Sequence, residues 1–127
     1  MKNMLLTVLL ATAGMLVASG PLFAHHNQAS FNRSVVTTVT GTVKEFNWMN
    51  PHAILVVAAK DDKGEITDWI IELAPLNSLV RDNGWSKTTF KIGDQLTIEG
   101  NAYKDGRKIM RPVKFVMPDG REMKGRF

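Results

Sequence analysis

Histidine is the residue whose type and spacing most directly suggest chemistry in this sequence. There are three, namely His25, His26 and His52, and there is no cysteine in the 127 residues. A neutral imidazole is the commonest transition-metal ligand, and a nitrogen set without thiolates suits Cu(II), Zn(II) or Ni(II). The three histidines are therefore the candidate metal ligands. The pattern does not require a cofactor, and Cu(II) and Zn(II) are the two ions that we consider first.

The adjacent pair His25-His26 follows a segment with the layout of a secretory signal peptide. It has Lys2, an apolar run of 14 residues from Met4 to Val17, and a small residue at Ala24. This run is shorter than the ~20 residues that span a bilayer. We expect residues 1–24 to be removed on export to the periplasm, leaving no stable membrane anchor. Cleavage after Ala18 or Gly20 and an uncleaved anchor are the alternatives.

Cleavage after Ala24 changes the chemistry of His25. The new terminus offers a free α-amine and the ring Nδ1 of the same residue, which form a small chelate that favours Cu(II). A third nitrogen then comes from His26 or His52. The alternative is a flexible amino terminus over residues 25–34 that holds no metal.

The third histidine lies in the stretch Phe46-Asn47-Trp48-Met49-Asn50-Pro51-His52. Pro51 fixes its own φ and ends the strand that precedes it, so His52 lies in a short, rigid loop. We predict a small binding site formed by Phe46, Trp48, Asn50 and His52, with the two aromatic rings as its apolar wall. The alternative is a histidine that bonds backbone groups in a turn, with the tryptophans in the core.

The rest of the sequence predicts strands separated by turns, with one short helix. Residues 34–48 are rich in Val and Thr, and Gly41 within them indicates a bulge or a bend. Residues 53–60 and 65–73 read as a hairpin around a turn at 61–64. Pro75, three apolar residues at helical spacing and Asn83-Gly84 predict a helix. Two strands follow, over 95–103 and 107–117, with Pro112 at an edge or a bulge.

This order of elements predicts the fold class. Three strands, a helix and two strands, with a long first strand bent at a glycine, is the order of the five-stranded Greek-key OB barrel. We predict an all-β, OB-like domain with one short helix over residues 35–127, following the signal peptide 1–24 and the flexible segment 25–34. An open antiparallel sandwich built from the same strands is the alternative.

Composition excludes several classes of function. Without cysteine there is no thiolate site or cysteine nucleophile, and neither a Gly-x-Ser-x-Gly motif nor a glycine-rich phosphate loop occurs. Most acidic residues lie in predicted turns, which favours a solvated role over acid–base catalysis. The net charge of +4 is spread along the chain, so we expect no nucleic-acid partner.

Several of these stretches together resemble a family. The chain is similar to small exported bacterial proteins catalogued as a domain of unknown function. The resemblance rests on the signal peptide, the His-His start and the motifs Phe-x-Trp-x-Asn-Pro-His-Ala, Gly-Asp-x-Leu-x-Ile-x-Gly and Pro-Asp-Gly-Arg. It covers nearly all of the expected mature chain. It implies a periplasmic OB-like domain and no particular reaction.

Three functions remain after this reading of the sequence. The first is a non-enzymatic periplasmic module that binds a metal ion or small ligand near His52. The second is an envelope domain that holds a protein or a glycan without metal. The third, ranked last, is a copper-dependent oxidase that uses His25. The sequence leaves the oligomeric state open.

Overall fold

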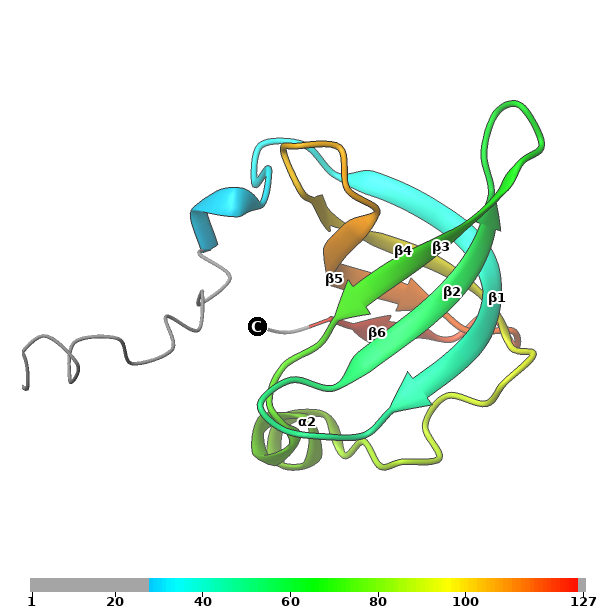
Figure 1. Cartoon of the computed structure of the whole chain (residues 1–127). Coiled ribbons are helices and arrows are strands. Elements are labelled where there is room, and N and C mark those ends of the chain that lie inside the picture. Colours follow the sequence, from blue (N-terminus) through cyan, green and yellow to red (C-terminus); the bar gives the residue numbers. More distant parts are fainter. Residues whose placement is uncertain (1–27, 126–127) are drawn as a thin grey trace, which may run out of the picture.

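The computed structural model describes residues 28–125 and folds them into a closed barrel with one helix (Figure 1). The predicted signal peptide, His25 and His26 lie outside the described residues. In chain order the elements are η1 (Gln28–Ser30), β1 (Thr37–Asn47), β2 (Ile54–Lys60), β3 (Ile66–Glu72), α2 (Leu76–Asn83), β4 (Gln95–Ala102), β5 (Ile109–Val116) and β6 (Glu122–Lys124). No helix within 28–125 has both the length and the apolar composition needed to cross a bilayer.

The strands close in the order β3-β2-β1-β4-β5, with β6 added beside β5. All neighbouring pairs are antiparallel except β3 and β5, which pair in parallel at Ile70–Ile109 and Ile71–Met110. This short parallel ladder joins the two ends of the sheet. The predicted five-stranded OB-like barrel with its helix between β3 and β4 is thereby confirmed, and the open sandwich is excluded.

A bulge in β1 decides which of its side chains enter the core. The pairing of β1 with β2 slips by one residue between Val43 and Glu45. Before the slip, Val39 and Val43 face inward and are buried. After it, Phe46 also packs against the core, although simple alternation puts Phe46 and Val43 on opposite faces. The bulge therefore lies at Lys44 and not at the predicted position, Gly41.

Gly41 has a different role, which is to let two strands approach closely. A Cβ atom added there lies 2.3 Å from the carbonyl oxygen of Ala58. Gly100 is similar, since a Cβ there lies 2.3 Å from the carbonyl oxygen of Arg111. The register of β4 and β5 slips beside Gly100, which pairs with Pro112. The extra residue of this bulge is Val113, so the predicted edge or bulge at Pro112 is a bulge at the next residue.

The core is a single cluster inside the barrel. Its largest fully buried side chains are Phe115, Leu55, Ile71, Leu73, Leu79, Leu96, Ile98 and Met110. Phe90 joins the aromatic part of this core, since its ring contacts Phe46, Trp85 and Phe115 at centroid distances of 5.2, 5.2 and 5.1 Å. Mostly edge-on contacts of this kind stabilise aromatic clusters beyond the area they bury.

Helix α2 begins and ends close to the predicted residues. Pro75 is its N-cap, and Gly84 ends it in the left-handed conformation at φ 66°, which glycine adopts without strain. Leu79 is the residue of the helix that is buried in the core. The helix covers one end of the barrel (Figure 1).

The described part of the amino-terminal segment is packed on the barrel. Phe31 is only 3% exposed, forms a β-bridge with Tyr103 and contacts that ring at 4.4 Å. Asn101 donates to the carbonyl oxygens of Asn32 and Val35. Within the segment expected to be flexible, 25–34, the described residues thus include a buried aromatic ring, Phe31, that the sequence pattern did not place in any strand.

We expect Gly41→Ala to destabilise the fold by about 1–3 kcal/mol, the usual cost of forcing extra atoms into a packed interior. The added methyl group collides with a backbone carbonyl that cannot move without disturbing β2. Urea denaturation measures the effect, and Thr38→Ala, an exposed change in the same strand, is the control. An equal effect of the two substitutions would contradict the close approach at Gly41.

Candidate functional site

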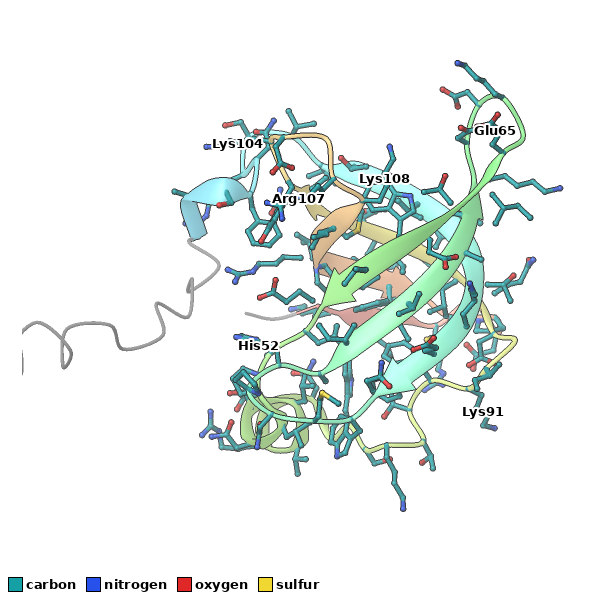
Figure 2. The ribbon with its side chains drawn as sticks, viewed as in Figure 1. His52, Glu65, Lys91, Lys104, Arg107 and Lys108 are labelled. Carbon is teal, nitrogen blue, oxygen red and sulfur yellow. The ribbon has the colours of Figure 1, made fainter. Side chains whose placement is uncertain are left out.

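The candidate site is the β1–β2 loop, residues 48–53, at the end of the barrel beside α2. Figure 2 shows His52 there, far along the barrel from Lys104, Arg107 and Lys108. Within the loop the Asn50–Pro51 peptide bond is cis. The predicted site residue His52 is partly buried.

His52 is held by the backbone at the end of β3. Its Nδ1 lies 2.8 Å from the carbonyl oxygen of Leu73. Because that oxygen can only accept, Nδ1 carries the proton and donates it. Nε2 is the ring nitrogen of His52 that this hydrogen bond does not use. Metal-binding histidines show this arrangement, in which one ring nitrogen donates to a carbonyl and the other binds the ion.

Asn50 ties the same loop to the helix. Its Oδ1 accepts a hydrogen bond of 3.2 Å from the amide of Leu76, the first residue of α2. Pro75 at the N-cap position supplies no side-chain bond to the helix. Asn50 thus acts as an N-cap from a distant part of the sequence. Asn50 therefore lies in the same loop as His52, as predicted, and its side chain caps the helix.

The predicted aromatic wall, Phe46 and Trp48, belongs partly to the core. The two rings contact each other at 5.7 Å, and Phe46 also contacts Phe90. Both are partly buried and pack against the core cluster. They therefore fix the strand end from which the loop leaves. The other tryptophans lie elsewhere, since Trp85 is buried in the core and Trp69 lies under Lys108.

His52 is the one histidine among residues 28–125. No group of three or more histidine, aspartate or glutamate side chains in that range could hold an ion. The two other candidate ligands, His25 and His26, lie outside the described residues.

A series of contacts connects the amino-terminal segment with His52. The Arg111 guanidinium lies 4.4 Å from the centre of the Phe31 ring and donates to Glu72 at 3.1 Å. Glu72 precedes Leu73, whose carbonyl holds His52.

A hollow in the described surface lies apart from the β1–β2 loop. It has a volume of about 760 Å³ and lies between the end of α2, the following loop and the β5–β6 turn. Its lining balances Asp82, Asp94 and Asp119 against Lys91, Arg121 and Lys124. Hydrogen bonds from the backbone and side chain of Arg121 lower the pKa of Asp119. Sequence reasoning missed this hollow because two segments that are distant in the sequence, 82–94 and 117–124, form it.

We expect Asn50→Ala to cost about 1 kcal/mol of stability, the usual loss when a helix N-cap is removed. Urea denaturation measures the loss. Asn47→Ala is the matched control, because the Asn47 side chain bonds the exposed carboxylate of Glu45 and does not reach the helix. If both substitutions cost the same, Asn50 does not cap α2.

Comparisons with known proteins give a family but no activity. No curated protein matches the chain. The crystal structure of Rim1, a mitochondrial single-stranded DNA binding protein from S. cerevisiae, is similar over 72% of this chain and 96% of that chain, with 12% identity and a TM-score of 0.46. The model of a family of unknown function (DUF6152) matches residues 13–110. The chain therefore belongs to this family of unknown function.

Proposed function

We propose that this protein is a non-enzymatic binding module, exported to the periplasm, that takes a transition-metal ion at Nε2 of His52. The remaining ligands come from His25 and His26. The hydrogen bond from Nδ1 of His52 to the Leu73 carbonyl carries the proposal. It fixes the tautomer and orients the ring before any ion arrives, which lowers the cost of binding.

The choice of ion follows from the ligand types. Imidazole nitrogens with an amino-terminal amine favour Cu(II), and imidazoles alone also suit Zn(II). Both ions need a neutral imidazole, so acidification releases them. The proposal includes no reaction, because binding alone accounts for the arrangement of His52.

The proposal also includes no nucleic-acid partner. OB-fold proteins bind oligonucleotides on the face of strands 2 and 3, where bases stack on aromatic side chains. On β2 and β3 the outward positions that are at least partly exposed hold Ile54, Val56, Ala58, Lys60, Ile66, Asp68 and Ile70. None of these is aromatic, which supports the absence of a stacking surface there.

The same face favours a second candidate, a domain that holds an envelope protein or glycan without metal. Ile70 is 40% exposed and Ile66 is 69% exposed. Ile70 lies opposite Val56 in the hairpin register. An outward apolar strip on two adjacent strands is a surface that a partner could cover.

Metal titration of the exported protein tests the proposal. After its mass and first residue are determined, Cu(II) and Zn(II) are added and the melting temperature is followed. A ligand at 100 times its Kd stabilises the native state by about 2.7 kcal/mol. We expect stabilisation by at least one of the ions, and loss of that effect in His52→Ala.

Two further variants separate a ligand from a structural histidine. His52→Asn keeps an N–H donor for the Leu73 carbonyl but lacks Nε2, so we expect near-normal stability without metal and no tight binding. One extra residue before His25 blocks the chelate of amine and ring nitrogen, so Cu(II) binding should weaken. If no ion binds below ~10 μM, the metal proposal fails and the second candidate remains.

A further inference from the structure

Two adjoining hollows lie where the amino-terminal segment crosses the barrel. Both are lined by Phe31 and Arg33. The first, about 370 Å³, also has Lys104 in its lining. The second, about 500 Å³, also has Arg111 and Asn101. They are independent of the site at His52.

These hollows differ in charge from the hollow beside the end of α2. Among the described residues that line them there is no aspartate or glutamate, whereas the hollow beside α2 has equal numbers of acidic and basic side chains. A cleft lined by one sign of charge concentrates the field and raises the local concentration of an oppositely charged ligand. The charge of Arg33, Lys104 and Arg111 therefore selects an anion.

Arg111 is held in a fixed orientation. Its side chain is only 13% exposed, and Nη2 donates to Oε1 of Glu72 at 3.1 Å. The guanidinium also lies over the Phe31 ring at 4.4 Å. Arg33, which lines both hollows, and Lys104, which lines the first, are the two other cations of the described lining.

The backbone that carries Arg33 is fixed on both sides. The amide of Asn32 donates to the Ala102 carbonyl at 2.8 Å. Asn101 Nδ2 donates to the carbonyl oxygens of Asn32 and Val35 at 3.2 and 3.0 Å. Lys104 is attached to the same segment, because its amide donates to the Ser30 carbonyl. The backbone at Arg33 and at Lys104 is thus held beside the hollows by these hydrogen bonds.

We propose that these hollows bind the phosphate group of a small phosphorylated molecule or of a lipid headgroup. Guanidinium groups match the oxygens of a phosphate with paired hydrogen bonds, and a lysine adds a point charge. A phosphate monoester offers three terminal oxygens and a diester offers two, so one phosphate group can contact several cations. The volumes lie in the range of small-molecule sites.

Binding is measured with the exported protein in EDTA, so that no metal can bridge the phosphate. The probes are inorganic phosphate, glycerol phosphate, and phosphatidylcholine vesicles with and without phosphatidylglycerol. Isothermal titration gives the affinity for the soluble probes, and co-sedimentation gives it for vesicles. Binding confined to the anionic vesicles identifies a lipid headgroup, and binding of glycerol phosphate identifies a soluble ester, each in support of the proposal.

The double variant Arg33→Gln with Lys104→Gln should weaken binding by about tenfold or more, since it removes two charge-assisted contacts. The matched control, Lys63→Gln with Lys87→Gln, removes the same charge from exposed positions outside both hollows and should change the affinity by less than about twofold. Arg111 is left intact because it pairs with buried Glu72, and urea midpoints verify that both variants fold. Equal weakening in both, or no binding of any probe at ~1 mM, overturns the proposal.

Discussion

The β1–β2 loop depends on one residue, Leu73, at the junction of β3 and α2. Its amide donates to the Ala53 carbonyl at 2.9 Å, and its carbonyl accepts from His52 at 2.8 Å. Asn50 adds the bond to the first amide of the helix. These bonds join the loop, the last residues of β3 and the start of α2 into one unit. The orientation of His52 therefore depends on the junction of β3 and α2 at this end of the barrel.

The parallel pairing of β3 with β5 places an ion pair, Arg111 with Glu72, next to Leu73. It brings Arg111 of β5 beside Glu72 at the end of β3. Glu72 is a buried carboxylate, 6% exposed, and such a group is tolerated only with a partner of opposite charge. Arg111 in turn supports Phe31, so the same ion pair also fixes where the amino-terminal segment meets the barrel. The Arg111–Glu72 pair therefore links the closure of the barrel, the amino-terminal segment at Phe31 and the proposed phosphate site.

Much of the fold could be predicted from local signals. The turn at 61–64, the helix ending at Gly84 and the bulge next to Pro112 all depend on glycine, proline or aspartate, whose backbone preferences act over a few residues. The bulge at Lys44 has no such signal, since it shows itself only in the pairing of β1 with β2. It moves Phe46 into the core, which pure alternation does not foresee. Phe31 was also missed, because a single aromatic residue outside a strand pattern gives no sign of burial.

Two residues of the candidate loop, His52 and Asn50, could be predicted from the sequence. Residue type and the proline drew attention to His52 and Asn50, and the structure places both in one loop. Their partners, the carbonyl of Leu73 and the amide of Leu76, are backbone groups more than twenty residues away, which no side-chain pattern reveals. Whether His25 and His26 complete a metal site stays a prediction, since both lie outside the described residues.

Nitrogen-15 NMR of the His52 side chain tests the central claim most directly. Long-range proton–nitrogen spectra of the exported, labelled protein report which ring nitrogen carries the proton, before and after Zn(II) is added. The account predicts a protonated Nδ1 without metal, and a large change at Nε2 alone when zinc binds, with the Nδ1 proton retained. A protonated Nε2 in the metal-free protein, or no change at Nε2 with zinc, would contradict it.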